Sequence, residues 1–265
     1  MFSLNIKPQY IPARYFSFCV LLTVLLVTLS IRSLQGELFI TDAQYMVAAG
    51  RWIIANGHLP TTDPLSIHSE LTYICQQYPI CILVAVLYDT FGEMSVRLFF
   101  ALLDMVAVLF IWYQTFPKAG NRILHCAVSC VFGAVIVYST LSATDQKSIS
   151  IERAFQAMRE DGAVSGTAVL TDIDPGCRAE LNGFKPYLDT RIEVFNGQNG
   201  QKNVLAEAGK ALSSGSLSAI CDDYGMDYAV LNYGINDVGI QDLKESGFKP
   251  VYSDNLTVCL KRSTV

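Results

Sequence analysis

The chain has 265 residues, of which 51% are hydrophobic and only 16% are charged, and its mean hydropathy is positive at +0.34. This composition is too apolar for an ordinary water-soluble domain of this length and favours a membrane protein. The formal net charge is −5 and the sequence has no basic stripe, which argues against a nucleic-acid-binding protein.

The apolar residues are concentrated in four segments with the dimensions of membrane spans. Three of them are close to the length that crosses a hydrocarbon core of about 30 Å; they are residues 15–31, 98–116 and 123–141. The fourth, residues 73–91, has Gln76 and Pro79 near its start and Asp89 near its end, which leaves a shorter apolar core. We therefore expect an α-helical membrane region over residues 1–141 with about four spans.

The charges around the first apolar segment predict how the chain would lie in a membrane. Lys7 and Arg14 precede the segment and place the N-terminus in the cytoplasm by the positive-inside rule. The segment is longer than a signal-peptide core and no small-x-small cleavage site follows it, so we interpret it as an uncleaved membrane anchor. The polar loop of residues 33–72 then lies outside. Four spans return the C-terminal domain to the cytoplasm, whereas the domain lies outside if residues 73–91 do not cross.

A short amphipathic helix is predicted within this outer loop. Thr41 and Gln44 fit a capping box for a helix that begins at Asp42, and Asn56-Gly57 supplies a left-handed stop. A spacing of three and four residues places four side chains on one face of the helix: Asp42, Tyr45, Ala49 and Trp52. Because Tyr and Trp favour the headgroup region, we expect the helix to lie along the membrane surface.

The composition changes after about residue 140, where the chain gains charge and loses its long apolar runs. Residues 142–265 alternate between helical and strand patterns, which predicts a small soluble α/β domain. The expected strands are residues 167–171, 185–189 and 227–232, with a closing hairpin at 251–254 and 256–260. The expected helices are residues 151–159, 203–212 and 217–224.

Neither the cysteines nor the histidines form a recognisable site. The eight cysteines show no disulfide framework, although a Cys75–Cys81 pair on the outer side stays open. The three histidines have no paired Cys or His motif beside them. We therefore predict structural or surface roles for them and expect no metal and no cofactor.

Two parts of the chain carry a resemblance to a known family. Asp-x-x-Tyr at 42–45, Gly-Arg-Trp-Ile at 50–53 and Gly-His-Leu-Pro-x-x-Asp-Pro-Leu-Ser at 57–66 resemble the first outer loop of bacterial membrane glycosyltransferases of the GT-C class. Those enzymes are similar in architecture to protein mannosyltransferases and use polyprenyl-phosphate sugars. Residues 181–195 and 224–228 look like the extramembrane α/β domain that closes many such chains.

The resemblance implies a sugar transferase with one catalytic carboxylate. A lipid phosphate leaves as a stable anion, so the acceptor hydroxyl needs a general base while the leaving group needs little help from an acid. The family places its base at the position of Asp42. The candidate substrate-binding residues are Tyr45, Arg51, Trp52 and Asp63. The implied partners are membrane lipid, a polyprenyl-phosphate sugar donor and a partner membrane protein, without nucleic acid.

Structural roles explain the same residues without catalysis. An Asp at a helix start is favoured by the helix dipole, Arg51 suits lipid headgroups, and Asp63-Pro64 is an ordinary turn. The alternative hypothesis is therefore a shortened, catalytically inactive protein whose C-terminal α/β domain binds a partner or ligand. Four polar residues follow the predicted strands of that domain, where α/β sheets often place sites, although turn and salt-bridge roles are favoured: Asp172, Asp174, Asp189 and Arg191.

Overall fold

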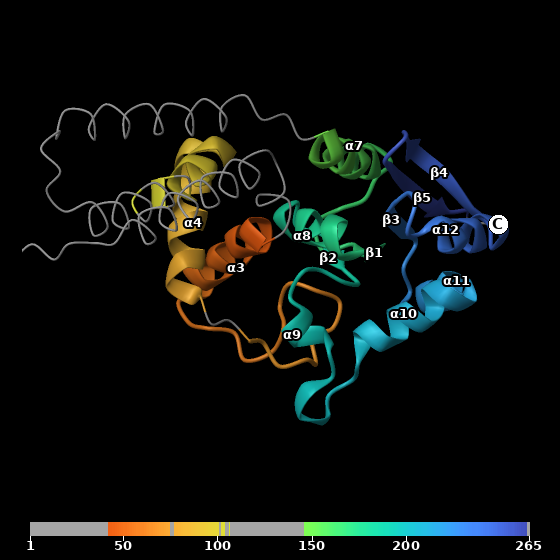
Figure 1. Ribbon diagram of the computed structural model, residues 1–265, viewed down its shortest axis with the longest axis horizontal. Helices are drawn as coiled ribbons and strands as arrows, with labels where there is room; N and C mark the ends of the chain where they lie inside the picture. The colour runs from red at the N-terminus through yellow and green to blue at the C-terminus, as the bar shows by residue number, and fades with distance from the viewer. Residues whose placement is uncertain (1–41, 75–76, 101, 104–105, 107–145, 264–265) are drawn as a thin grey trace, which may run out of the picture. The chain divides into compact units, whose positions relative to one another are not determined.

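The computed structural model describes residues 42–74, 77–100, 102–103, 106 and 146–263 (Figure 1). The described residues from 92 to 106 belong to one compact unit, and those of 42–91 and 146–263 belong to another. The second unit is discontinuous in sequence, because the chain leaves it after residue 91 and returns near residue 146. It carries the β-sheet.

The structure contradicts the predicted membrane-spanning region. Among the described residues, no helix has both the length and the apolar character that a membrane crossing requires. The weakest predicted span, residues 73–91, forms helix α4 (Tyr78–Phe91) of 14 residues, about 21 Å long at 1.5 Å per residue and too short for a core of about 30 Å. The predicted membrane fold class and the predicted membrane localisation, a bacterial inner membrane by the resemblance, are therefore wrong. The predicted spans 15–31 and 123–141, and most of 98–116, lie outside the described residues.

Helix α3 (Asp42–Asn56) has the predicted bounds but not the predicted surface position. Gly57 follows it with φ of 71°, and the Gly57 amide donates to the carbonyl oxygen of Ile53 at 2.8 Å, which is the expected left-handed stop. Eight of its residues are buried, on more than one side of the helix. Part of this burial is contact with α4, because a Cβ on Gly50 would lie only 2.0 Å from the carbonyl oxygen of Cys81.

A five-stranded mixed sheet has the strand order β2-β1-β3-β5-β4. The strands are β1 (Ala168–Thr171), β2 (Lys185–Pro186), β3 (Tyr228–Asn232), β4 (Phe248–Ser253) and β5 (Thr257–Arg262). β1 runs parallel to both β2 and β3, whereas β5 is antiparallel to β3 and β4. All five residues of β3 are buried, as expected for a central strand covered on both faces. The strand predicted at residues 185–189 corresponds to β2, which is only two residues long.

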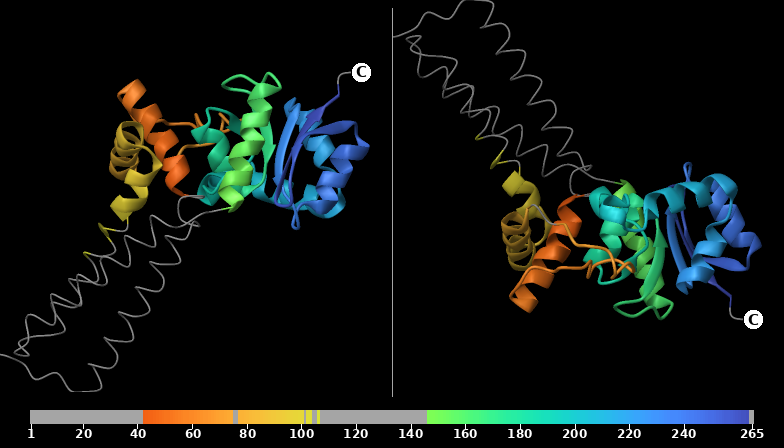
Figure 2. Two further views of the ribbon diagram at one scale, coloured as in Figure 1. Left: turned by 90° about the horizontal axis from the view of Figure 1, so that it is seen from above. Right: turned by 90° about the horizontal axis from the view of Figure 1, so that it is seen from below.

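Helices cover the two faces of this sheet, and Figure 2 shows the sheet between α7 and α12. Phe155 and Met158 of α7 pack with Val169 and Val230 in one buried cluster. The other cluster contains Leu170 together with apolar residues of the later helices. The helices after the break are α7 (Gln146–Glu160), α8 (Ile173–Leu181), α9 (Ile192–Phe195), the 3-10 turn η2 (Gln198–Gly200), α10 (Val204–Ser214), α11 (Leu217–Tyr224) and α12 (Asp237–Glu245).

The segment of residues 57–74, which we call the strap, is part of the same core as the α/β elements. Leu71 is buried in the cluster that contains Leu170. The Ile67 amide donates to the carbonyl oxygen of Pro186 at 3.1 Å, next to the short strand β2. The predicted outer loop and the predicted C-terminal domain therefore share one compact unit in the described part of the chain.

Candidate functional site

The predicted catalytic residue, Asp42, is the first residue of α3 and is exposed. Its side chain has no hydrogen bond or ion pair with any other described residue. Arg51, about two and a half turns further along the helix, forms an ion pair with Asp89 of α4 at 2.5 Å. Trp52 contacts the His58 ring edge-on, with the ring centroids 5.3 Å apart. Arg51 and Trp52 therefore both contact other residues of the same chain.

Tyr45 and Asp63 are brought together in a different place, around Arg191. The Tyr45 ring lies 6.0 Å from the Arg191 guanidinium carbon. Asp63 is fully buried, and its carboxylate accepts from Arg191 Nη1 at 2.6 Å and from Ser66 Oγ at 2.5 Å. Burial is the largest single influence and would raise the pKa of Asp63, but the charge of Arg191 and the hydrogen bonds from Arg191, Ser66 and the Leu65 amide together outweigh it, and the pKa is lowered. A structural role accounts for every one of these contacts.

The polar residues at the carboxyl end of β1 and β3 form a better candidate site. From β1 the chain passes through α8 to β2, which lies on one side of β1 in the sheet, and β3 lies on the other side of β1. The direction in which successive strands are added to the sheet therefore reverses between β1 and β3. In α/β sheets, ligands bind outside the carboxyl ends of the strands at such a switch point. Asp172 follows β1 directly, and Asn232 is the last residue of β3.

Asp172 is held by two asparagines from the neighbouring strand and its loop. Asn232 donates to it from the backbone amide at 3.4 Å and from Nδ2 at 3.5 Å, both long contacts. Asn236 Nδ2 donates to Asp172 Oδ2, the oxygen that also accepts from the Asn232 backbone amide, and to the carbonyl oxygen of Asn232 at 2.9 Å. Thr257 Oγ1 of β5 donates to Asn232 Oδ1 at 3.1 Å. The network therefore joins the ends of three strands.

The surroundings of Asp172 place its titration near neutral pH. Burial of the carboxyl group raises its pKa to about 7, the hydrogen bond from Asn236 opposes the rise, and the charge of Asp174 adds to it. Lys147 of α7, which forms an ion pair with Asp174, opposes the rise weakly. A carboxyl group with a pKa near 7 can both accept and donate a proton at physiological pH.

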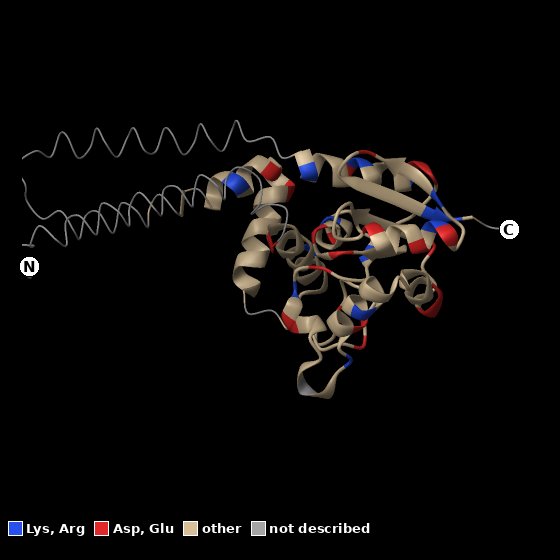
Figure 3. Cartoon of the chain, turned by 45° about the vertical axis from the view of Figure 1, so that its right-hand side comes forward, with Lys and Arg blue, Asp and Glu red and all other residues tan. Residues whose placement is uncertain are grey.

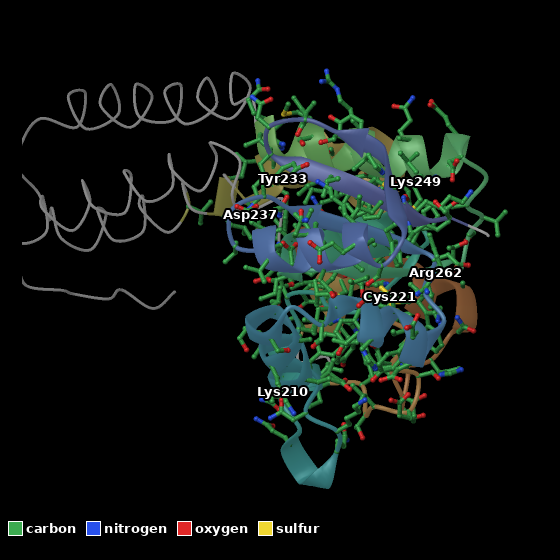
Figure 4. All side chains as sticks on the ribbon, turned by 90° about the vertical axis from the view of Figure 1, so that its right-hand side faces the viewer. Lys210, Cys221, Tyr233, Asp237, Lys249 and Arg262 are labelled. Carbon is green, nitrogen blue, oxygen red and sulfur yellow. The ribbon has the colours of Figure 1, made fainter. Side chains whose placement is uncertain are left out.

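Exposed apolar residues are the chain neighbours of two members of this network. Ile173, next to Asp172 in the chain, is 38% exposed, and Ile235, next to Asn236, is 85% exposed. Figure 4 shows Tyr233 and Asp237 at this end of the unit and Lys249 and Arg262 at the opposite end. The carboxyl end of β1 and β3 therefore combines the titratable Asp172 carboxyl group with exposed apolar side chains, as small-molecule sites do.

The described residues offer little to a metal ion or to a basic ligand surface. Among them, no group of three or more His, Cys, Asp and Glu side chains could hold a metal. Cys81 is buried, and its suggested disulfide partner Cys75 lies outside the described residues. His68 is buried with Nε2 3.0 Å from the carbonyl oxygen of Tyr187, which is a structural position. Figure 3 shows Lys and Arg residues interspersed with Asp and Glu.

Sequence reasoning noticed Asp172 at a strand end but missed its two asparagine partners. The available signal was the spacing Asn232-x-x-x-Asn236 directly after a buried strand, since it puts two amide side chains at the edge that Asp172 also reaches. Without the pairing of β1 with β3, this spacing is indistinguishable from a loop.

Comparison of the chain with protein-family models, with curated proteins and with solved structures gives no match. The resemblance to GT-C glycosyltransferases therefore stays a prediction, and so do the sugar donor and the partners that it implies. A function for this chain is therefore inferred from the geometry of the described residues.

Proposed function

We propose that the unit of residues 42–91 and 146–263 binds a small hydroxyl-bearing ligand at the carboxyl end of β1 and β3, with Asp172 accepting a hydrogen bond or a proton from it. The observation that carries the proposal is the position of Asp172 at the switch point of the sheet together with its pKa of about 7. This combination is typical of functional carboxyl groups rather than of turns.

The surrounding residues have distinct roles in this proposal. Asn232 and Asn236 orient the carboxylate through their amide groups. Ile173 and Ile235 offer their exposed side chains to the carbon skeleton of the ligand. A hydroxyl group suits the site because it can donate to the ionised form of Asp172 and accept from its protonated form.

Binding is tested by NMR titration of the protein with small polyols and with carboxylates of matched size. We expect polyols to shift the amide signals of Asp172, Asn232 and Asn236. The Asp172→Asn variant should weaken the affinity by about tenfold or more, because it removes a charge-assisted hydrogen bond. The control is Asp223→Asn, an exposed carboxylate on α11. Polyols that leave these signals unchanged, or that bind the Asp172→Asn variant equally well, would reject the proposal.

Sugar transfer with Asp42 as general base is a second candidate, favoured by one observation. Asp42 is exposed at the start of α3 and its carboxylate is uncommitted within the described residues. If the chain transfers sugar from a polyprenyl-phosphate donor, Asp42→Asn should reduce turnover by about 10²-fold to 10⁴-fold and leave the fold intact, because Asn also suits a helix start. Near-normal turnover in this variant would remove Asp42 from the mechanism.

A further inference from the structure

The strap is fastened to the α/β elements by a buried cluster of four charged residues. Arg191 lies at the centre, and its guanidinium contacts Asp63 of the strap at 2.6 Å, Glu180 of α8 at 2.5 Å and Asp189 at 2.5 Å. All four side chains are completely shielded from solvent. Asp63 is the one member that comes from the strap, 128 positions before Arg191.

The cluster has more acidic groups than its single guanidinium can neutralise. One guanidinium faces three carboxyl groups, so full ionisation would leave a net charge of −2 among side chains that are shielded from solvent. Burying uncompensated charge is costly, and such a site holds a proton instead. Glu180 is the member that holds it: burial and the charges of Asp189 and Asp63 together outweigh Arg191 and raise its pKa well above the usual value.

The hydrogen bonds of Glu180 agree with this assignment. Its Oε1 accepts from Arg191, whereas its Oε2 is buried and has no hydrogen-bond partner among the described residues. An ionised carboxylate would leave a full acceptor unsatisfied at that position. Protonation of Glu180 removes that charge, and Asp189, which interacts with the Glu180 side chain and raises its pKa, offers an acceptor for the proton.

The other groups around the cluster do not supply a second positive charge. The rings of Tyr45, Tyr73 and Phe195 lie about the guanidinium carbon at 6.0, 5.7 and 5.7 Å. His68 of the strap is neutral at physiological pH because burial lowers its pKa. The Cys177 thiol of α8 is also neutral, since burial raises its pKa. An ionised Glu180 would therefore meet no positive charge from these groups in addition to that of Arg191.

We propose that the strap is a proton-dependent latch, which stays docked on the α/β elements while Glu180 is protonated and undocks when Glu180 ionises. Undocking removes the Asp63 carboxylate from the cluster and lets water reach Arg191 and Glu180. The strap is the part that can leave, because Glu180 and Asp189 are built into α8 and the β2–α9 connection. Its other attachments to the α/β elements are all made by this one segment: the hydrogen bonds Ile67–Pro186, Lys185–Pro64, His68–Tyr187 and Thr72–Gln201, the rings of Phe195 and Tyr224 beside His68, the Tyr73 ring beside Arg191, and the buried Leu71 side chain.

The latch is tested by hydrogen–deuterium exchange of the whole protein measured from pH 6 upward and corrected for the intrinsic pH dependence of exchange. We expect the corrected exchange of the Ile67 amide to rise by about tenfold or more above the ionisation of Glu180, while amides of β3 stay protected. Glu180→Gln should abolish this rise, since the variant cannot ionise. The matched control is Glu152→Gln, a half-exposed carboxylate on α7, and it should retain the rise.

Two results would overturn the latch. One is corrected exchange of Ile67 that does not change with pH in the unmodified protein. The other is simultaneous exposure of Ile67 and β3, which would show global unfolding instead of release of the strap. Should Glu180→Gln fail to fold, Asp63→Asn tests the same point, because it removes the strap's own charge and should also eliminate the pH dependence of Ile67 exchange.

Discussion

At the scale of single residues, the structure separates carboxyl groups that look alike in the sequence. Asp42 is exposed at a helix start, Asp63 is buried against Arg191, and Asp172 is enclosed without a direct positive partner. Only the last environment opposes ionisation, because burial of a carboxyl group is not offset by an adjacent cation. The environment of each side chain, rather than its place in a motif, therefore determines its chemistry.

Asp172 makes the stability of the protein depend on pH in a definite direction. A carboxyl group whose pKa is about 7 in the folded protein and near 3.8 when unfolded contributes stability that is fully present below pH 3.8 and is lost as the pH rises through 7. We expect Asp172→Asn to flatten this dependence and to raise the free energy of unfolding above pH 7, by up to about 4 kcal/mol. Urea denaturation of both proteins between pH 4 and pH 8 measures the difference. If the free energies of unfolding of the two proteins change with pH in parallel, Asp172 does not have the raised pKa.

At the scale of elements, local patterns predicted the positions of the helices well but the lengths of α4 and of the strand β2 poorly. Asn56-Gly57 gave the end of α3, since a left-handed cap acts within one turn. The predicted capping box involves Thr41, which lies outside the described residues, and the buried Gln44 side chain has no hydrogen-bond partner among the described ones. The burial of α3 on several sides was not predictable, because it depends on α4 and on residues far along the chain. An apolar run such as that of α4 has the same composition whether it packs in a core or crosses a bilayer, and only its 14-residue length distinguishes the two.

The crossing of α3 and α4 gives a prediction about Gly50. A methyl group at this position would lie 2.0 Å from the Cys81 carbonyl oxygen and 2.7 Å from the Ala85 Cβ, so Gly50→Ala must push the helices apart. We expect a loss of about 1–3 kcal/mol in the free energy of unfolding. Gly209→Ala is the control: it lies in α10 with nothing within 4 Å of the added carbon, and it should stabilise by about 0.5–1 kcal/mol. Equal effects in the two variants, measured by thermal denaturation, would contradict the close approach.

At the scale of the whole molecule, the unit is assembled from two segments that the sequence presents as separate parts. The α/β pattern of residues 142–265 predicted its strands and helices, but nothing local to Asp63 or Leu71 indicates that they belong to the same core. The Arg191 cluster depends on an ion pair 128 positions apart, and single-sequence patterns hold no information over that distance. The candidate site was predictable in part, as Asp172 at a strand end, and its asparagine partners were not.

The two ion pairs Arg191–Asp63 and Arg51–Asp89 provide a matched test of this assembly. Asp63→Ala leaves Arg191 paired with Asp189 and Glu180 but removes the acceptor of the buried Arg191 Nη1 and Ser66 Oγ groups, and it should cost about 1–3 kcal/mol. Asp89→Ala removes the partner of Arg51 at a half-exposed position and should cost less than about 1 kcal/mol. Chemical denaturation of both variants measures the difference. A small effect for Asp63→Ala would show that the strap contributes little to the stability of the unit.

The discontinuous unit also constrains the order of events on the ribosome. Asp63 is synthesised 128 residues before Arg191, and at about 5–20 residues per second this interval lasts roughly 6–26 s. During that time the side of α3 that packs against α8 and the Leu71 side chain lack their partners, so the nascent chain exposes apolar surface until those later elements have been synthesised. Synthesis of this protein should therefore be sensitive to chaperone supply and to slow codons between the two segments.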